Sequence, residues 1–318
     1  MGSRPEIVVV GSHAPGLFVR VKRVPIAGET VIGWDFSEPL DGGKGSNQAI
    51  AASRLGAAVS FVGCIGDDRL GHNGELWMLE AGVDTRHLIW RADVPTGVGF
   101  TLLDEGANPA MVVSRGANSE LSKEQVEYAL DDLQGAKVLL TQFEILPDVA
   151  IHATKTAKRR GMISVVNPAP APDSNCLDWS ATDILVPNEI EAKHLVGHSI
   201  TGKADPLALA ELLRTRTGVV CVIITLGEEG IAVCDKTGVW QIRPPSVQIV
   251  DTSGAGDVYC AALAVALAQG ICIRAAAEWS CYAAALSVTR AGTIPAFPTR
   301  REVDEFRRSK GEGSPSLL

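Results

Sequence analysis

The chain contains no apolar run long enough to cross a membrane and no recognisable leader segment. No stretch of about 18 unbroken apolar residues occurs, which excludes a conventional membrane-spanning helix. Residues 1–10 lack the long apolar region and the small-residue cleavage site of a signal peptide. These two absences predict a protein without a membrane partner.

An excess of positive charge and paired cysteines are also missing. The net charge is −8 and the pI is near 5.3, which argues against nucleic acid as a partner. The seven cysteines include no Cys-x-x-Cys pair, so neither a disulfide framework nor a zinc site is expected. Five cysteines stand within apolar runs, namely Cys64, Cys221, Cys234, Cys260 and Cys281. We expect these to be buried free thiols of a cytoplasmic protein.

What the chain does contain is a regular alternation of strand-like and helix-like segments, with 46% apolar residues among 318. Strands are expected at 6–10, 60–65, 138–141, 163–167, 183–186, 219–225, 231–233, 239–242 and 247–250. Helices are expected at 46–55, 148–160, 189–195, 256–268 and 274–288. Such repeats predict an α/β protein of three layers, in which helices cover both faces of a mostly parallel central sheet.

Two segments interrupt this alternation, at about 17–40 and 95–115. The first is extended and rich in proline and glycine, and the second alternates apolar and polar residues around a turn at 104–108. Both predict small antiparallel strands outside the main sheet. They would form a β-sheet lid over a site, with a surface for a homodimer. Residues 1–309 are expected to form one domain that includes this lid, and residues 310–318 a disordered tail.

The most informative run is Asp-Thr-Ser-Gly-Ala-Gly-Asp at 251–257, which opens an apolar helix. Small residues at a helix N-terminus let backbone N–H groups converge on an anion, and the helix dipole favours negative charge there. Asp257 places an acid inside this anion-binding turn. As structure alone it makes little sense, but it suits a base that takes a proton from a hydroxyl attacking phosphorus.

A second glycine-rich run, Asp-Gly-Gly-Lys-Gly-Ser-Asn-Gln, occupies 41–48. Its glycines let the backbone approach a ligand, while Lys44 and Asn47 offer donors to hydroxyls. A tight strand-to-helix turn with a positive φ angle explains the run equally well. It matches neither a Walker A loop nor the dinucleotide-binding glycine pattern.

Polar residues also follow three predicted strands, at the edge where open α/β sheets bind ligands. Asn-Pro-Ala-Pro stands at 167–170, Pro-Asn-Glu-Ile-Glu at 187–191 and Thr-Leu-Gly-Glu-Glu-Gly at 225–230. Asn188 fits a helix cap, which for this pair is the stronger interpretation, although Glu191 one turn later could hold magnesium through water. The 225–230 turn is either a simple connector or a cradle for nucleotide phosphates.

Together these runs resemble the ribokinase-like (PfkB) carbohydrate kinases, and the ribokinase branch most of all. The resemblance extends from 10–12 to 288–290. Both family signatures are present, at 42–48 and 251–257, and the other three runs lie between them in the expected order. The resemblance implies one α/β domain with a β-sheet lid, a sugar between lid and sheet, and ATP on the open side.

The resemblance also implies roles for individual residues. Asp257 corresponds to the catalytic base, and the anion hole corresponds to Gly254, Ala255 and Gly256. The positions implied to bind the sugar are Gly42, Gly43, Lys44, Asn47, Glu144 and Asp257. Those implied to bind ATP are Asn188, Thr225, Gly227, Gly230 and Gly256. Glu191 would hold Mg²⁺ through water, and a monovalent cation such as K⁺ is implied at Asp251, Ser253, Ser287, Arg290 and Gly292.

The chain departs from the family pattern on the sugar side. After the first strand the family has Gly-Ser-x-Asn-x-Asp, whose amide and carboxylate contact the sugar, whereas this chain has Ala14 and Gly16. A site built to bind hydroxyls discriminates through such groups, so ribose is disfavoured as the acceptor. A smaller departure is Ala296, which replaces a hydroxyl ligand of the monovalent cation and weakens the expectation of potassium.

The altered loop suggests two kinds of acceptor. A bulkier or differently hydroxylated sugar could fit the space that is freed. An acidic acceptor is the second possibility, with His13, Arg20, Lys44 or Arg115 as candidate cations near the lid. For His13 and Arg20, a solvated strand face is the favoured interpretation.

We predict an ATP-dependent carbohydrate kinase that uses Mg²⁺ and phosphorylates a primary hydroxyl of a small sugar or sugar derivative. A nucleoside kinase is the alternative within the same class, because relatives share the phosphate-binding residues. A catalytically silent sugar-binding or regulatory protein is the alternative from another class, and the intact Asp257 argues against it. An NAD-dependent oxidoreductase is disfavoured, because the glycine fingerprint after the first strand is missing.

Overall fold

The computed structural model describes residues 5–106, 109–172, 177–197 and 204–311. A large sheet contains β1 (Ile7–Val10), β4 (Val59–Gly66), β5 (Asp84–Arg91), β8 (Val138–Gln142), β9 (Ile163–Asn167), β10 (Ile184–Leu185), β11 (Cys221–Thr225), β12 (Ile231–Asp235) and β13 (Gly238–Ile242). A small sheet contains β2 (Gly16–Val21), β3 (Gly33–Ser37), β6 (Val98–Leu103) and β7 (Pro109–Ser114). The helices are α1 (Gly43–Arg54), α2 (Arg69–Glu80), α3 (Lys123–Asp132), α4 (Pro147–Arg159), α5 (Glu189–Leu195), α6 (Pro206–Thr217), α7 (Ala255–Ala268), α8 (Ile273–Ser287) and α9 (Arg300–Ser309).

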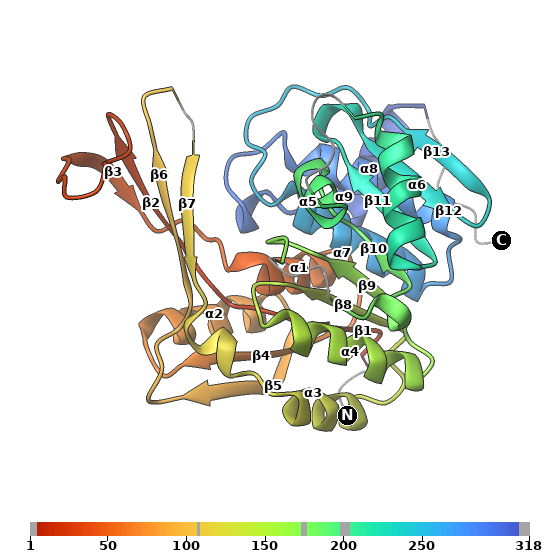
Figure 1. Cartoon of the computed structure of the whole chain (residues 1–318), viewed down its shortest axis with the longest axis horizontal. Coiled ribbons are helices and arrows are strands. Elements are labelled where there is room, and N and C mark those ends of the chain that lie inside the picture. The colour runs from red at the N-terminus through yellow and green to blue at the C-terminus, as the bar shows by residue number, and fades with distance from the viewer. Residues whose placement is uncertain (1–4, 107–108, 173–176, 198–203, 312–318) are drawn as a thin grey trace.

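The large sheet is mostly parallel. Its strand order is β13-β12-β11-β10-β9-β8-β1-β4-β5. All neighbours from β11 to β5 run parallel, whereas β12 pairs antiparallel with both β11 and β13. Helices lie on both sides of this sheet (Figure 1). The predicted three-layer α/β fold is therefore confirmed.

Alternation of side chains along the strands creates two hydrophobic cores, one on each face. In β1, Ile7 and Val9 face the core built with α1, α2, α7, α8 and α9. Val8 and Val10 face the opposite core, which is built with α3, α4, α5 and α6. Because a strand buried on both faces has no polar side, these strands are continuously apolar in sequence.

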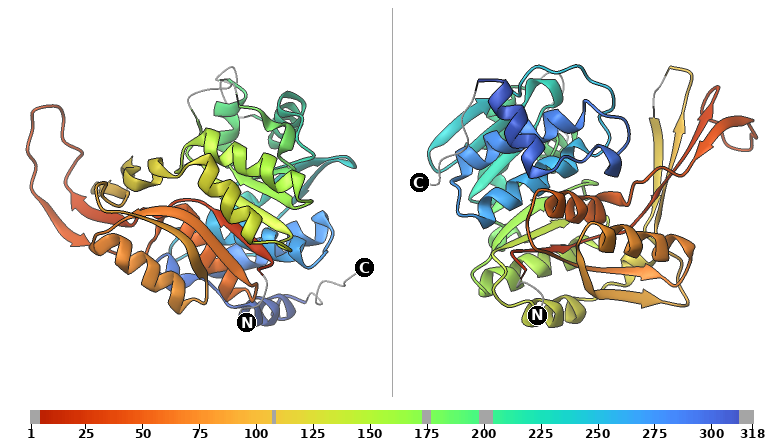
Figure 2. Two further views of the ribbon diagram at one scale, coloured as in Figure 1. Left: turned by 90° about the horizontal axis from the view of Figure 1, so that it is seen from below. Right: turned by 180° about the vertical axis from the view of Figure 1, so that it is seen from behind.

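The small sheet projects away from the α/β body (Figures 1 and 2). The predicted lid strands are confirmed, but the expected pairing is partly wrong, because β2 and β6 pair in parallel and only β2–β3 and β6–β7 are antiparallel. The reason is topological. The strands β1 and β5 run in the same direction, and each is followed directly by a lid strand. Part of the predicted turn at 104–108 lies outside the described residues.

The predicted strand at 247–250 is wrong. These residues follow the edge strand β13 and belong to no sheet. Ile249 and Val250 are exposed, with 41% and 58% of the residue surface accessible. The N–H groups of Val250 and Asp251 both donate to the carbonyl of Val288, at 2.8 and 3.2 Å. The segment is thus held by backbone hydrogen bonds to the end of α8 and not by pairing with the sheet.

The remaining predictions concern membrane helices, cysteines and the ends of the domain. Within the described residues, no helix is both long and apolar enough to cross a bilayer. The five cysteines predicted to be buried free thiols are buried and unpaired. Most of the predicted tail, 312–318, lies outside the described residues, and the domain boundaries stay a prediction.

Candidate active site

Asp257 lies in the first turn of α7. Gly254 caps this helix with a φ angle of 73°, and a Cβ atom there would lie 2.7 Å from Thr293 and 2.9 Å from the ring of Phe297. Both the backbone angle and the space therefore require glycine at this position. The sharp turn delivers Asp257 to the carboxyl edge of the sheet, where α1 also begins.

Two side chains from α1 hold the Asp257 carboxylate. Gln48 donates from Nε2 to Oδ1 at 2.9 Å, and Asn47 donates from Nδ2 to Oδ2 at 3.2 Å. Asp257 is only 6% exposed. Burial raises the pKa of Asp257 to about 6. The charge of Lys44 and the hydrogen bond from Gln48 act in the opposite direction and limit this increase. A carboxyl group with this pKa can accept and release a proton near neutral pH.

The start of α7 also presents unused donors. Within the described residues, the N–H groups of Gly256 and Asp257 donate to no protein acceptor. Gly256 is exposed, and no atom lies within 4 Å of the place where its Cβ would stand. Free N–H groups at the positive end of a helix form an anion site. The predicted anion hole and Asp257 are therefore neighbours.

The glycine-rich run at 42–48 forms the N-terminus of α1, which begins at Gly43 and not at Ser46 as predicted. Gly43 has a φ angle of 74°, as the turn interpretation required. A Cβ atom there would lie 2.9 Å from the carbonyl oxygen of Ala14 and 3.1 Å from Oε2 of Glu144. Glycine at this position lets the helix approach the loop that follows β1.

Glu144 links the end of β8 to both of these segments. Its Oε2 accepts from the Ser12 hydroxyl at 2.6 Å and from the Lys44 N–H at 2.9 Å. Burial alone would lower the pKa of Lys44, but nearby carboxylates, led by Asp257 and Glu144, hold it above its ordinary value. Lys44 is therefore a cation among carboxylates, and the predicted sugar-contacting residues do lie together.

Asn188 and Glu191 form a reciprocal cap on α5. Asn188 Oδ1 accepts from the Glu191 N–H, and Glu191 Oε2 accepts from the Asn188 N–H, each at 2.8 Å. The capping interpretation is thus confirmed. Burial raises the pKa of Glu191, whereas the hydrogen bond from Asn188 and the charge of Lys44 oppose the increase. This charge coupling indicates that Glu191 faces the same region as Lys44.

The turn at 225–230 follows β11 beside Asn188. Thr225 bridges to Asn188, and the Thr225 N–H donates to Pro187 at 2.9 Å. Gly227 and Gly230 have φ angles of 60° and 89°. A Cβ on Gly230 would lie 2.0 Å from the carbonyl of Ile242, whereas one on Gly227 would meet nothing within 4 Å. Gly230 therefore serves the β11–β12 connection, and Gly227 leaves an open surface.

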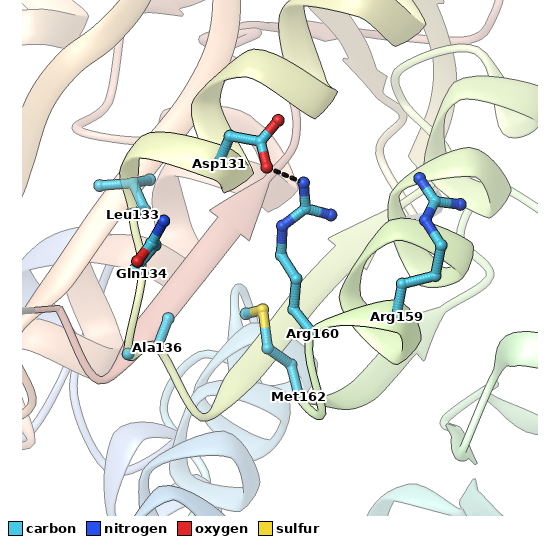
Figure 3. Close-up of a pocket in the computed structure, with 8 residues that line it drawn as sticks. Asp131, Leu133, Gln134, Ala136, Arg159, Arg160 and Met162 are labelled. Carbon is cyan, nitrogen blue, oxygen red and sulfur yellow. Dashed lines mark hydrogen bonds and ion pairs between the residues drawn. The ribbon is translucent and has the colours of Figure 1, made fainter.

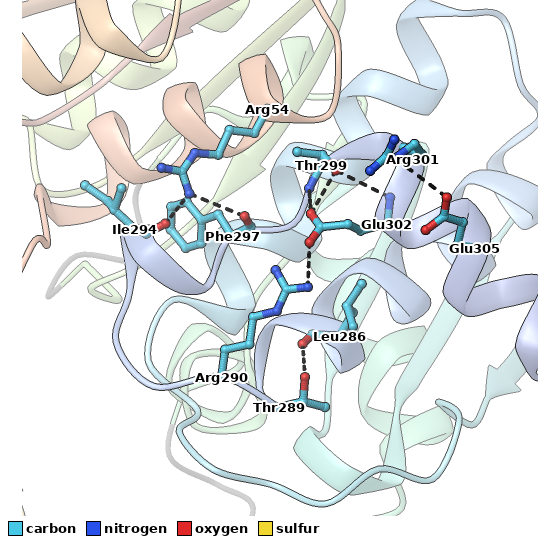
Figure 4. Close-up of polar contacts among 10 residues, drawn as sticks. All are labelled: Arg54, Leu286, Thr289, Arg290, Ile294, Phe297, Thr299, Arg301, Glu302 and Glu305. Carbon is cyan, nitrogen blue, oxygen red and sulfur yellow. Dashed lines mark hydrogen bonds and ion pairs between the residues drawn. The ribbon is translucent and has the colours of Figure 1, made fainter.

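The residues predicted for a monovalent cation come from two adjacent loops. Asp251 joins the loops, because its Oδ1 accepts from the Ser253 N–H and its Oδ2 from the Gly292 N–H, each at 2.9 Å. Burial would raise the pKa of Asp251, but these N–H donors hold it below its ordinary value. The Ser287 carbonyl accepts from the Arg290 N–H at 3.2 Å. The Arg290 side chain instead donates from Nη2 to Oε1 of Glu302 at 2.7 Å (Figure 4).

With this geometry in view, comparisons with known proteins decide the family. Residues 7–300 match the pfkB family carbohydrate kinase. The chain belongs to this family. It is similar to the ribokinase of Bacillus subtilis, with 37% identity over 304 residues that cover 95% of this chain and 99% of the relative.

Solved structures agree with this assignment. The kinase resembles ribokinase from Giardia lamblia, with a TM-score of 0.86, 30% identity and coverage of 98% and 100% of the two chains. It also resembles Arabidopsis thaliana ribokinase complexed with ribose and ATP, with a TM-score of 0.82, 28% identity and coverage of 96% and 99%. The protein is therefore a carbohydrate kinase, a phosphotransferase with an alcohol group as acceptor.

The cations suggested for an acidic acceptor occupy different places in the kinase. His13 is fully buried, so the expectation of a solvated strand face is wrong for this residue. Its Nε2 donates to the carbonyl of Leu70 at 3.2 Å, and its Nδ1 lies within hydrogen-bond distance of the Ser46 hydroxyl, at 2.9 Å. Burial lowers the pKa of His13 to about 4. His13 therefore brings no positive charge to the site.

The two arginines also differ from each other. Arg20 is exposed on the lid and lies 3.8 Å from Asp35 across β2 and β3, as expected for a solvated strand face. Arg115 donates from Nη2 to the carbonyl of Phe143 at 3.3 Å. Because Phe143 precedes Glu144, the guanidinium of Arg115 is the one that approaches the site.

Sequence reasoning missed Gln48 as a contact of Asp257, although it lies next to Asn47. Gln48 also donates to Oδ1 of Asn167 at 3.4 Å and accepts from Gln142. The buried side-chain amides of Gln48, Gln142 and Asn167 thus form a connected group, which contacts the Asp257 carboxylate through Gln48. A polar pair at the start of an otherwise apolar helix was the available signal.

A pocket of about 540 Å³ elsewhere in the kinase takes no part in this site. It lies between Asp131 and Met162, and Arg160 crosses it to pair with Asp131 (Figure 3). Its lining residues precede β8 and β9, so it lies at the amino edge of the sheet. Asp257 lies at the opposite edge.

The residues present fit a magnesium ion that is held mainly by water and phosphate. Among the described residues, no cluster of three or more His, Cys, Asp or Glu side chains is placed to bind a metal. Glu191 uses Oε2 in the cap, and its Oε1 makes no hydrogen bond to the described residues. One free carboxylate oxygen near bound phosphates is what Mg²⁺ requires, since it retains several waters.

Proposed function

We propose that this kinase transfers the γ-phosphoryl group of ATP to a primary hydroxyl of a small sugar or sugar derivative, with Asp257 as the general base. The observation that carries the proposal is the position of Asp257. Its carboxylate is buried and held at both oxygens, and it lies beside the free N–H groups of Gly256 and of Asp257 itself. Phosphoryl transfer needs this combination of base and anion site.

The proposed reaction follows from this arrangement. Asp257 accepts the proton of the acceptor hydroxyl while that oxygen bonds to the γ-phosphorus. The bond from the γ-phosphorus to the bridging oxygen breaks, and ADP leaves with the electron pair. The N–H groups at the start of α7 donate to the phosphoryl oxygens as charge redistributes.

Lys44 and Glu144 position the acceptor in this proposal, together with Gly42, Gly43 and Asn47. The nucleotide lies along Asn188, Thr225 and Gly227, where the open surface at Gly227 gives it room. Mg²⁺ would neutralise phosphate charge, and Glu191 would hold it through water. A monovalent cation such as K⁺ would lie between the loops that Asp251 joins.

The size of the acceptor is supported by the relatives. Proteins that match nearly the whole chain are named ribokinases, and one solved relative is complexed with ribose and ATP. This supports a pentose-sized acceptor, although Ala14 and Gly16 alter the loop after β1.

A coupled assay of ADP release tests the proposal. The panel contains ribose, 2-deoxyribose, hexoses, sugar acids and nucleosides, with no acceptor as the blank. ATP turnover that requires one of the sugars, with phosphate found on its primary hydroxyl, is the expected result. Preference for a nucleoside would place the protein among the nucleoside kinases. Failure of every acceptor to stimulate turnover would favour a silent sugar-binding protein.

We also propose a homodimer through the lid. Large apolar side chains are exposed on the lid segments, namely Ile26, Ile32, Trp34, Phe36, Phe100, Met111 and Val112. Exposed large apolar side chains gathered on one small sheet favour an interface. A second copy of the chain is the occupant proposed, and sedimentation analysis measures it.

A further inference from the structure

Asp41 lies one residue before the α1 N-cap, at the base of the lid segment. Its Oδ1 accepts from Nδ2 of Asn47 at 2.7 Å and from the Gly43 N–H at 3.3 Å. Its Oδ2 makes no hydrogen bond to any of the described residues. The side chain is partly buried. One carboxylate oxygen is thus anchored, and the other is available to a ligand.

The same amide connects Asp41 to the proposed base. Asn47 Nδ2 also donates to Oδ2 of Asp257 at 3.2 Å. A primary amide carries two hydrogens, so the two carboxylates lie on either side of one NH₂ group. A small molecule whose hydroxyl meets Asp257 therefore brings its other hydroxyls within reach of Asp41.

Gly16 makes room for this carboxylate. A Cβ atom on Gly16 would lie 2.9 Å from Oδ2 of Asp41 and 2.8 Å from the ring of Phe18. Gly16 is not among the glycines with a positive φ angle, so its backbone does not demand glycine. The space that a side chain at position 16 would enter is filled by Asp41 and Phe18.

We propose that Asp41 binds a hydroxyl of the acceptor through Oδ2 and is a specificity-determining residue of the kinase. The inference rests on the proposed function of the site. It also states the class of acceptor. Asp41, Glu144 and Asp257 bring three carboxylates to the site, and these outnumber the two nearby cations, Lys44 and Arg115. The acceptor is therefore a neutral polyhydroxylated sugar, and the charge that position 16 lacks is supplied by Asp41 from another segment.

A purely structural role for Asp41 is the competing explanation. Its Oδ1 accepts from the first turn of α1, where a negative charge is favourable. Asp41→Asn separates the two roles, because the amide oxygen still accepts from Asn47 and Gly43. The substitution removes the charge and converts the second oxygen into a donor.

The experiment measures steady-state kinetics for the best acceptor and for its series of single-deoxy analogues. Hydrogen bonds to a charged group are strong, so kcat/KM of Asp41→Asn for the sugar should fall about 10- to 100-fold. The loss should appear mainly in KM, because the contact is made in the ground state as well. The KM for ATP and the melting temperature should be unchanged.

The deoxy series identifies the contact. Wild type should discriminate strongly against one deoxy analogue, and Asp41→Asn should use that analogue and the parent sugar about equally well. Asp35→Asn is the matched control, since it makes the same change on the lid surface. An identical discrimination profile in wild type and Asp41→Asn would overturn the inference, as would a lower melting temperature without a change in KM.

A double variant that moves the carboxylate from position 41 to position 16 gives an independent test of the inference. Asp41→Ala removes the carboxylate beside Gly16, so Gly16→Asp in that background can place a carboxylate in the same region once the Phe18 ring shifts aside. Recovery of several-fold in kcat/KM over Asp41→Ala is expected, and equal values for the two variants would contradict the inference. Failure of the proposed function is distinguishable, because wild type itself would then show no sugar-dependent ADP release.

Discussion

Gln48 donates a hydrogen bond of 2.9 Å from Nε2 to Oδ1 of Asp257, a residue 209 positions further along the chain. This contact joins the N-termini of α1 and α7 at the carboxyl edge of the sheet. It orients the carboxylate and stabilises its charged form, because the amide can only donate at that oxygen. The two glycine-rich runs of the sequence thereby become one site.

The first prediction concerns the base. Asp257→Asn should reduce kcat by about 10²- to 10⁴-fold, which is the usual contribution of a general base. The assay is ADP release with the best acceptor, and ATP binding is followed by calorimetry. Asp67→Asn, a surface change of the same kind, should have normal activity. Near-normal turnover of Asp257→Asn would show that another group takes the proton.

The second prediction concerns pH. Burial raises the pKa of Asp257 to about 6, and a base acts only when it is unprotonated. Activity, measured as kcat/KM, should therefore be low below pH 6 and rise as the pH increases through 6. Lys44→Met removes the charge that opposes the increase, so the acidic limb should move to higher pH.

The pH at the midpoint of the acidic limb does not depend on the absolute rate. It can therefore be measured even if Lys44→Met retains little activity. Lys236→Met alters an exposed lysine in the β12–β13 turn and should leave the limb in place. A limb that stays near pH 6 in Lys44→Met would mean that a different group titrates.

The third prediction compares two glycines at the ends of α1, Gly43 at its first residue and Gly56 just after its C-cap. Gly43→Ala and Gly56→Ala both place alanine at a positive φ angle, 74° and 93°. A Cβ on Gly56 meets nothing within 4 Å, whereas one on Gly43 meets Ala14 and Glu144. Gly56→Ala should lower the free energy of unfolding by about 1 kcal/mol. Gly43→Ala should lower it further and abolish most activity, as measured by urea unfolding and the kinase assay.

The fourth prediction concerns the monovalent cation. Activity should be higher with K⁺ than with a bulky organic cation at equal ionic strength. Asp251→Asn replaces an oxygen that accepts from Ser253 or Gly292 with a donor, so it should raise the K⁺ concentration for half-maximal activity several-fold. Activity that is independent of every monovalent cation would contradict the proposed site.

The fifth prediction tests the lid dimer. Phe36→Glu combined with Met111→Glu should give a monomer in sedimentation experiments, because both side chains are exposed apolar groups of the lid. Leu76→Glu, at an exposed position of α2, should leave the assembly unchanged. If wild type sediments as a monomer, the dimer proposal fails.

Much of the fold could be predicted from local patterns. Continuous apolar strands between helices indicated a parallel sheet covered on both faces, and the run at 41–48 indicated a turn with a positive φ angle, which Gly43 adopts. The wrong strand at 247–250 shows the limit of this approach. An apolar run does not by itself specify a strand, because residues 247–250 are hydrogen-bonded to the end of α8 and pair with no strand.

The sequence by itself determined the phosphate side of the proposed site, since the proposed base and the proposed anion site lie within the single run 251–257. The tertiary structure alone decided the environment of that chemistry. Burial of His13, the amide contacts to Asp257 and the approach of Asp41 to Gly16 all join residues far apart in the chain. Local rules cannot encode such contacts, because they depend on how separate segments pack.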